Sequence, residues 1–375
     1  MNVVAAATEV ADVAGAAAER SEQARCLEPE VVQAMRDADL FRLCVPQGLG
    51  GAEAPPRDLF EAVEAIARQD ASAAWILAVT ATSGLLAAYL EESAAAHVFG
   101  PPGVAVGGVF APRGRAVGAD GTLEVTGRWS FASGSTFCDW LLGGCVTEID
   151  RGAPELRLVL FPRADVRLHD TWTVSGLRAT GSHDIEVSAL SVPAARSATV
   201  IGAGPRVQAP LYAFPMFGLL AVAIAAVALG AARAALEDLG DLAGVKKPEG
   251  SSRRLAERPA TQAGMARAEA SLRASRALLT NELDRAFAAA ETGGEIVTEV
   301  RMSLRLAATH AVRSAKDVVD AAYEMGGGSS VYADSPLQRR FRDVHVATQH
   351  MLVAPATWEL TGRLLLELPT DTSQL

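Results

Sequence analysis

The periodicity of the chain changes twice, and this limits the folds that it can adopt. Before Gly100-Pro-Pro-Gly103 and after Pro205, apolar residues recur at the spacing of buried helices. Between these points they form short extended runs or, as in Leu123–Phe131, alternate with polar residues, which is the pattern of half-buried strands. The sequence therefore predicts helices, then an insert of strands, then helices again.

These boundaries predict three domains in an α+β, mostly α, fold. We expect an N-terminal helical domain over 1–103, a middle β-domain over 104–205 and a C-terminal four-helix bundle over 206–375. Short strands separated by turn residues favour an antiparallel barrel or sandwich for the middle domain. Long helices joined by short turns favour the bundle.

Individual elements can also be assigned. We expect helices from Glu19 to about Phe99, with Pro29 in the first turn of one and Asp70 as a cap before another. In the last domain, Gly326 should end a long helix, and a final long helix should contain Leu352 and Leu364. The predicted strands are 104–110, 123–131, 140–146, 156–161, 172–174 and 185–187.

Composition excludes several classes of function. The net charge of −10 argues against nucleic-acid binding, which needs clustered Lys and Arg. The four cysteines show neither metal-ligand spacing nor the density of a disulfide framework, which favours free thiols in the reducing cytoplasm. Glu9 and Asp12 interrupt the first apolar stretch, so we expect no signal peptide.

One segment is long enough to cross a bilayer. No charged residue occurs from Val207 to Ala232. Pro210 and Pro215 break its first half, and Ala rather than Leu fills the second. A buried helix of a protein without membrane contact explains this composition better than a membrane span.

Common nucleotide and hydrolase motifs are missing. No Gly-x-Gly-x-x-Gly follows a predicted strand and opens a helix, so a Rossmann dinucleotide site is not supported. The chain also lacks a Gly-x-Ser-x-Gly elbow, a His-Glu-x-x-His zinc helix and a phosphate-binding P-loop.

Three other stretches carry a resemblance. They are Gly127-Arg-Trp-Ser-Phe-Ala-Ser-Gly-Ser135, Gly176-Leu-Arg-Ala-Thr-Gly-Ser182 and Pro336-Leu-Gln-Arg-Arg-Phe-Arg-Asp343. In this order, and with the helix–strand–helix arrangement, they resemble the acyl-CoA dehydrogenase superfamily from about Glu19 to Gly362. They look closest to its flavin-dependent monooxygenase branch, the oxygenase components of two-component hydroxylases.

The resemblance has one informative departure. Typical acyl-CoA dehydrogenases carry a late Tyr-Glu-Gly-Thr stretch whose Glu removes the α-proton of the substrate, and this chain has no such stretch. Without that base, α,β-dehydrogenation lacks its first proton transfer. In the monooxygenase branch, a His at the position of His350 faces the reactive edge of the flavin. The resemblance thus implies that reduced FMN or FAD from a separate flavin reductase hydroxylates an organic, aromatic or polycyclic substrate through a C4a-hydroperoxyflavin.

The resemblance also suggests cofactor-binding residues. It places Ser133 near flavin N5; the alternative, favoured when the resemblance is set aside, is that Ser133 and Gly134 only form a turn at a strand end. Thr180 and Ser182 fit a loop that binds the cofactor, or an ordinary turn. Trp129, expected on the same face of its strand as Phe131, is either core or a wall of the flavin site. In the superfamily, basic residues near Arg253 and Arg254 reach the cofactor of a neighbouring subunit; a solvated pair is the alternative.

His350 is the candidate for acid–base work, because imidazole exchanges protons near neutral pH. We place it on the last long helix, about 140° around from His345, which makes His345 a secondary candidate for substrate contact. A structural or surface role is the alternative for His350.

Two positions bear on the substrate. Phenol hydroxylases of this branch tend to carry a His after a Gly/Ala-Trp pair, whereas the helix after Trp75 offers Thr82 or Ser83. They also tend to have a polar group where this chain has Gly107-Gly-Val-Phe110. With Ser83, Phe110 and His345 as candidate substrate contacts, the pocket should be more apolar, which disfavours a phenol.

Two other functions stay open on the sequence alone, an acyl-CoA dehydrogenase-like enzyme with an atypical base and a non-catalytic member of the fold. The Ala-rich helices need a surface to bury against, and the resemblance implies a homotetramer, with a dimer as the alternative.

Overall fold

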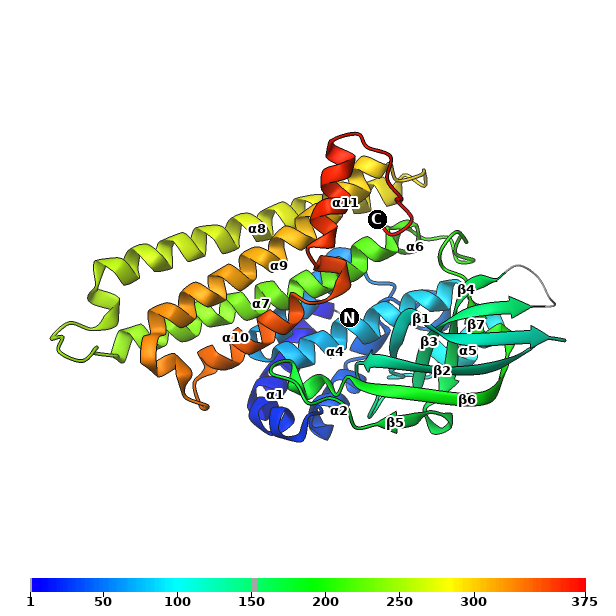
Figure 1. Cartoon of the computed structure of the whole chain (residues 1–375), viewed down its shortest axis with the longest axis horizontal. Coiled ribbons are helices and arrows are strands. Elements are labelled where there is room, and N and C mark those ends of the chain that lie inside the picture. Colours follow the sequence, from blue (N-terminus) through cyan, green and yellow to red (C-terminus); the bar gives the residue numbers. More distant parts are fainter. Residues whose placement is uncertain (1, 150–153) are drawn as a thin grey trace. The chain divides into compact units, whose positions relative to one another are not determined.

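A computed structural model describes residues 2–149 and 154–375 and confirms the mostly helical α+β fold class (Figure 1). Along the sequence, the strands follow one helical segment and precede another. The chain forms two compact units. Unit 1 contains the described residues of Met1–Pro55, Ile76–Val174 and Arg178–Ala213, and unit 2 contains Pro56–Trp75, Ser175–Leu177 and Phe214–Leu375.

The helices of unit 1 begin earlier than the sequence indicated. The first, α1 (Val3–Ala24), is capped by the Asn2 side chain, which accepts a hydrogen bond from the backbone of Ala5. Its buried face is mostly alanine, a small side chain whose contribution to helical periodicity is easily overlooked. The other helices of the unit are α2 (Pro29–Asp37), the later part of α4 (Ala71–Ser83), α5 (Glu92–Phe99) and α6 (Pro210–Ala213).

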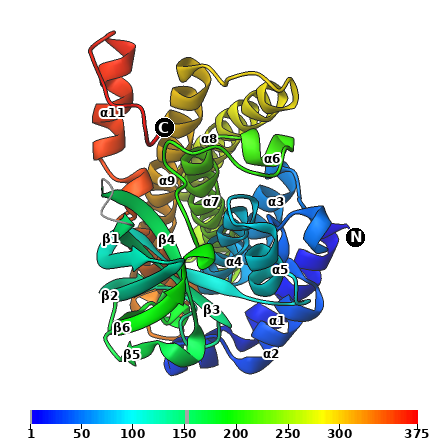
Figure 2. The same cartoon turned by 90° about the vertical axis from the view of Figure 1, so that its right-hand side faces the viewer.

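Unit 1 also contains a single sheet. Its strands are β1 (Val106–Ala119), β2 (Thr122–Ala132), β3 (Trp140–Ile149), β4 (Glu155–Pro162), β5 (Arg167–His169), β6 (His183–Pro193) and β7 (Ser197–Ala198). They are ordered β5-β6-β2-β1-β3-β4-β7, and Figure 2 shows β1, β2, β6 and β5 side by side.

Two sequence predictions about this sheet are wrong. The sheet is mixed rather than wholly antiparallel, because β2 returns the chain to the end where β1 starts and β3 then runs parallel to β1. The segment 172–174, predicted as a strand, lies outside the strands, and β5 pairs with β6 instead. Its alternating Trp172 and Val174 are too few residues to distinguish a strand from a loop.

A tryptophan fills the centre of the sheet. The side chain of Trp129 is fully buried and packs beside Phe161, with ring centroids 5.7 Å apart. Its indole Nε1 donates a hydrogen bond of 2.8 Å to the Gly144 carbonyl. A Cβ atom added at Gly143 would lie 2.5 Å from the indole ring, so the glycine makes the space that the ring occupies.

Beyond Trp129 the pattern of β2 breaks. The pairing of β2 with β6 shifts register between Trp129 and Ala132, and Phe131 has a φ of 70°. Phe131 is therefore 70% exposed while Trp129 is buried, so the prediction that they share a face is wrong. A bulge of this kind redirects a side chain that strict alternation would have placed inward.

Unit 2 is a set of packed helices. It contains α3 (Pro56–Gln69), α7 (Met216–Val245), α8 (Pro259–Glu291), α9 (Thr298–Gly326), α10 (Pro336–Ala347) and α11 (Ala356–Leu365). The long helices α7, α8 and α9 run alongside one another, and α3 packs on α7 (Figure 1). The fourth bundle member, α10, is short, so the predicted fourth long helix is absent from the described residues.

The charge-free segment lies largely in α7, where every residue from Gly218 to Ala232 except Leu220 is buried. Among the described residues, the segments Ala71–Ala88 and Met216–Val245 are long and apolar enough to cross a membrane, but 94% and 89% of their most apolar stretches are buried inside the fold. They behave as core helices, as the alanine content of the second one predicted.

We predict that Gly143→Ala destabilises the protein by about 1–3 kcal/mol, because its methyl group would overlap the Trp129 ring. Urea unfolding monitored by circular dichroism measures the change. Gly204→Ala is the matched control, since a Cβ there meets nothing within 4 Å. Equal stability of the two variants would contradict the proposed packing.

Candidate active site

Three hydroxyl groups meet at one end of the sheet in unit 1. The Oγ atoms of Ser133 and Ser182 lie 2.8 Å apart, and the Oγ1 atom of Thr180 lies 2.7 Å from the Ser182 hydroxyl. All three side chains are buried. The pairing of Ala132 on β2 with His183 on β6 brings the first two sequence motifs together here. We call Ser133, Thr180 and Ser182 the hydroxyl cluster.

Gly134 shapes the turn after Ser133. Its φ of 72° lies in the left-handed region, and an added Cβ would meet the Cys138 sulfur at 3.1 Å. Its N–H donates to the Thr180 carbonyl at 3.0 Å, and its carbonyl accepts from the backbone of Phe137 and Cys138. The turn predicted as the alternative role is therefore present, and it also presents the Ser133 hydroxyl to the cluster.

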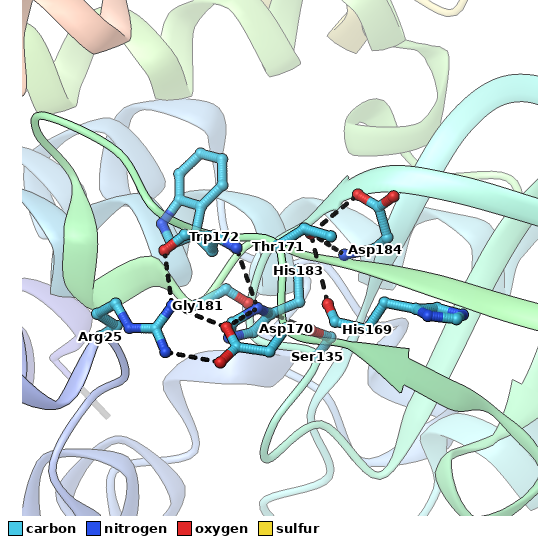
Figure 3. Close-up of polar contacts among 9 residues, drawn as sticks. All are labelled: Arg25, Ser135, His169, Asp170, Thr171, Trp172, Gly181, His183 and Asp184. Carbon is cyan, nitrogen blue, oxygen red and sulfur yellow. Dashed lines mark hydrogen bonds and ion pairs between the residues drawn. The ribbon is translucent and has the colours of Figure 1, made fainter.

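Figure 3 shows a polar network that includes Gly181 and His183, the two chain neighbours of Ser182. None of its contacts was predicted from the sequence. Arg25, at the C-terminal cap of α1, donates to both carboxylate oxygens of Asp170 at 2.7 and 2.8 Å and to the Trp172 carbonyl at 3.2 Å. The Trp172 N–H donates to His183 Nδ1 at 3.3 Å. These contacts fasten the loop that contains Trp172 to the first helix.

The protonation of this network follows from its contacts. The hydrogen bond and charge of Arg25 lower the pKa of Asp170. Burial lowers the pKa of His183, although Asp170 nearby opposes the shift. His183 is thus neutral near pH 7 and can accept the Trp172 N–H bond. Trp172 in turn packs edge-on against the exposed ring of Phe131, at 6.0 Å between centroids.

The donor set of unit 1 fits a flavin. Hydroxyl groups can donate to the ring nitrogens and accept from the N–H groups of an isoalloxazine. Phe131, close to Ser133 in the chain, adds an exposed aromatic surface suited to a flat apolar ring. The exposure of Phe131 was not predicted, because the bulge that turns its ring outward leaves no mark in the alternation of apolar and polar residues.

Trp129 has no such surface. Its fully buried ring packs against protein on the glycine-rich part of the sheet. Of its two predicted roles, this packing supports the core role.

In unit 2, His350 lies in a turn and not on a long helix as predicted. Helix α10 ends at Ala347, and His350 caps the short 3-10 turn Met351–Val353. Its Nδ1 accepts the Leu352 N–H at 3.3 Å, and its ring packs edge-on against Trp75 at 5.6 Å between centroids. The extended backbone of His350 and the proline at position 355 prevent one continuous helix here.

The surroundings of His350 determine its protonation. Burial, assisted by the nearby Arg305 cation, lowers the pKa of His350 to about 4. The ring is therefore neutral at pH 7. Because Nδ1 accepts a hydrogen bond, we assign the single ring proton to Nε2. His350 thus offers an N–H donor to a partner at Nε2.

Asp343 is the carboxylic acid nearest to this turn in the sequence, and it is held in the core. Its Oδ1 accepts the Leu177 N–H at 2.6 Å. Burial raises its pKa to about 7, against the effect of that hydrogen bond. A Cβ at Gly176 would overlap the Arg342 carbonyl, so the second and third sequence motifs meet closely within unit 2.

The remaining candidates are engaged with neighbouring protein groups. Ser83 donates to the Val79 carbonyl one helical turn earlier at 2.8 Å, and Phe110 packs against an apolar cluster of unit 1. His345 contacts the Phe341 carbonyl through Nδ1 at 2.7 Å and Asp320 through Nε2 at 3.5 Å. Each of the three side chains therefore has a structural role within the protein. Their contact with a substrate stays a prediction.

Arg253 and Arg254 are exposed in the segment between α7 and α8. Arg254 donates to the Gly244 carbonyl at 3.1 Å and forms a capping box with Glu257. Arg253 projects from the same segment, whose Ser251 hydroxyl bonds its backbone.

Known proteins resemble the chain along most of its length. Residues 4–97 match the N-terminal domain and residues 222–355 the C-terminal domain of the acyl-CoA dehydrogenase family. The indole-3-acetate monooxygenase of Pseudomonas putida is 32% identical, covering 91% of this chain and 87% of that protein. The flavin-dependent monooxygenase oxygenase subunit HsaA of Rhodococcus jostii is 28% identical over 89% of this chain and 90% of its own.

A solved structure has the same fold. XiaF from a Streptomyces species, determined with FADH2 and glycerol, superposes with a TM-score of 0.91 at 25% identity, covering 99% of this chain and 96% of that one. The chain therefore belongs to the acyl-CoA dehydrogenase superfamily, in its branch of flavin-dependent monooxygenases.

Proposed function

We propose that this chain is the oxygenase component of a two-component system, which receives reduced FMN or FAD from a separate flavin reductase and inserts one oxygen atom into a small aromatic or polycyclic substrate. The observation that carries the proposal is that this part of the chain contains a neutral His350 and an Asp343 carboxyl group that is already hydrogen-bonded. In the stretch 336–355, Asp343 is the one carboxylic acid, and it is bonded to a backbone N–H. This region therefore offers no free carboxylate base for dehydrogenation, but it does offer an N–H donor.

The hydroxyl cluster and Gly134 would hold the flavin in unit 1. When bound, the reduced flavin supplies the electrons that activate oxygen. Ser133 would hydrogen-bond N5, and Thr180 and Ser182 would fix the orientation of the Ser133 hydroxyl through the two short contacts between them. Phe131 and Trp172 would exclude water from the same face, which limits loss of the oxidant as hydrogen peroxide.

His350 would hold a proton at Nε2 and donate a hydrogen bond to an oxygen of the substrate or of the oxidant. Its low pKa keeps it neutral throughout the physiological range. A neutral donor stabilises developing negative charge on oxygen without first having to be protonated by solvent.

The substrate class follows from the relatives and from the apolar residues. Indole-3-acetate monooxygenase is named for an aromatic, bicyclic substrate. The predicted contacts Ser83 and Phe110 leave few free polar groups, because the Ser83 hydroxyl is bonded to its own helix. An apolar aromatic ring system suits such surroundings better than a phenol.

We further propose a cytoplasmic homotetramer in which Arg253 and Arg254 reach the flavin phosphate of a neighbouring subunit. Among the described residues, ten of the fourteen exposed large apolar side chains belong to unit 2, including Trp358, Leu365 and Leu366 on or just after α11. Burying such residues between copies favours assembly. All four cysteines are free, which suits a reducing compartment.

The central test mixes the enzyme with reduced FMN or FAD in oxygenated buffer, with indole as the aromatic probe. We expect the enzyme to slow the return of oxidised-flavin absorbance and to yield an oxygenated product instead of hydrogen peroxide. His350→Asn keeps an acceptor for the Leu352 N–H but removes Nε2, and should release at least about tenfold more peroxide per product.

His350→Gln is the matched partner, because its amide can restore a donor near Nε2. Partial recovery of product in this variant supports the donor role. Reduced flavin that reoxidises at the same rate with and without enzyme, for both cofactors, contradicts the oxygenase proposal.

Ser133→Ala should weaken flavin binding by about fivefold, the effect of one lost hydrogen bond. Equilibrium dialysis with oxidised FMN and FAD measures this. Ser191→Ala, on the exposed surface of β6, is the control. Unchanged affinity in Ser133→Ala would leave Ser133 with only its role in the turn.

Asp343→Asn should change how stability depends on pH. The folded-state pKa of Asp343, about 7, lies above its ordinary value of 3.8, so its contribution is complete below pH 3.8 and is lost as pH rises toward 7. Asn cannot ionise and still accepts the Leu177 N–H. The free energy of unfolding of the variant should therefore rise relative to wild type across this window, by at most about 1.4 kcal/mol per pH unit.

Urea unfolding between pH 4 and pH 8 provides the measurement, with the exposed Asp334→Asn as the control. A difference between wild type and Asp343→Asn that is constant with pH would contradict the burial argument.

A further inference from the structure

Two arginines of α9 hold the turn that carries His350. Arg313 donates to the carbonyls of Thr348 at 3.0 Å and Val353 at 3.3 Å, which are the two ends of the segment Thr348–Val353. Arg305, on the same helix, donates to the Leu352 carbonyl at 2.9 Å. We call Thr348–Val353 the His350 turn.

Arg305 is the more deeply placed of the two. Its side chain is 3% exposed, and its other terminal nitrogen donates to the Gln374 carbonyl at 2.6 Å. Its Nε has no hydrogen-bond partner, and no carboxylate among the described residues pairs with the guanidinium. Burial lowers the pKa of Arg305 to about 10, so it remains charged at pH 7. An unpaired buried charge acts strongly on its neighbours.

Leu352 connects Arg305 to His350. Its carbonyl accepts from Arg305, and its N–H donates to His350 Nδ1 at 3.3 Å. The two hydrogen bonds lie on either side of the same Cα atom, so fixing the carbonyl also fixes the direction of the N–H. The direction of that N–H determines which ring nitrogen of His350 can carry the proton.

We propose that Arg305 is a positioning residue for His350: by holding Leu352 and by its own charge, it keeps the imidazole neutral with its proton on Nε2. Among the described residues, Arg305 is the one charge that acts on His350 in addition to burial, and Asp343 on α10 makes no contribution. Helix α4 supplies Trp75, α7 is uncharged from Met216 to Ala232, and Glu359 on α11 is exposed. The importance of this arrangement for catalysis rests on the proposed function, but the arrangement itself can be tested without flavin.

The experiment is an NMR titration of the six histidines in the flavin-free protein, with His350→Asn to assign the His350 signal. We expect wild-type His350 to carry its proton on Nε2 and to titrate well below an ordinary histidine. Arg305→Met should raise the His350 pKa by about one unit, because a nearby positive charge is removed. Arg305→Lys keeps the charge and should leave the His350 pKa close to that of wild type.

Arg301→Met is the matched control. Arg301 is on the same helix and donates to the Thr372 carbonyl at 2.8 Å, but it does not bond the His350 turn. Circular dichroism and urea unfolding establish that each variant is folded.

Three results overturn the proposal. They are a wild-type His350 that is protonated on Nδ1, a His350 pKa that is the same in Arg305→Met as in wild type, and equal shifts in Arg301→Met and Arg305→Met. If Arg305→Met does not fold, the proposal is tested by Arg305→Lys and by the tautomer of wild-type His350. A His350 pKa in Arg305→Lys that differs from wild type would exclude the charge of residue 305 as the cause. If the protein shows no oxygenase activity but the His350 pKa still changes in Arg305→Met, only the proposed function is contradicted.

Discussion

The pairing of β2 with β6 determines the arrangement of the candidate flavin site in unit 1. It joins segments far apart in the sequence, and it extends to Ala132 and His183, immediately before Ser133 and after Ser182. Without this register the three hydroxyls would not meet, because each of them belongs to a loop that the strands position. The loop that contains Asp170 and Trp172 depends on the same pairing, since His183 accepts the Trp172 N–H.

In unit 2, the main constraint is that two buried ionisable groups are kept neutral. The imidazole of His350 and the carboxyl group of Asp343 lie seven positions apart in the sequence. Burial lowers the pKa of His350 and raises the pKa of Asp343. His350 is neutral throughout the physiological range and Asp343 is neutral in its lower part, and each accepts a hydrogen bond from a backbone N–H. Backbone amides can satisfy a neutral acceptor in a place where a counter-ion would be costly to bury.

The sequence was sufficient for the fold class and for most of the elements, because these depend on periodicity and on composition. The strand Leu123–Phe131, the cap at Asp70 and the helix end at Gly326 follow local rules, and they were predicted within a few residues. The family resemblance identified the Ser133 and Ser182 motifs, which the structure brings together. The parallel pairing of β1 with β3 depends on long-range topology, and alternation along a strand carries no information about it.

The details of the site were harder to predict for the same reason. Phe131 is exposed by a bulge, Arg25 reaches Asp170 from another element, and His350 leaves its helix where the backbone becomes extended. Each of these facts depends on a contact or a dihedral angle that the residue type alone does not determine. The burial of Arg305 was likewise not predicted, because its place in the sequence of α9 resembles that of an arginine on the exposed face of an amphipathic helix.

The bulge at Phe131 also has a consequence for how such an enzyme can diversify. Trp129 carries the packing of the sheet, whereas Phe131, its neighbour but one, is turned out of it. A change at position 131 would alter the shape and polarity presented beside Ser133 while leaving the core untouched. The strand thereby separates Trp129, on whose packing the centre of the sheet depends, from Phe131, whose ring contacts Trp172 outside that core.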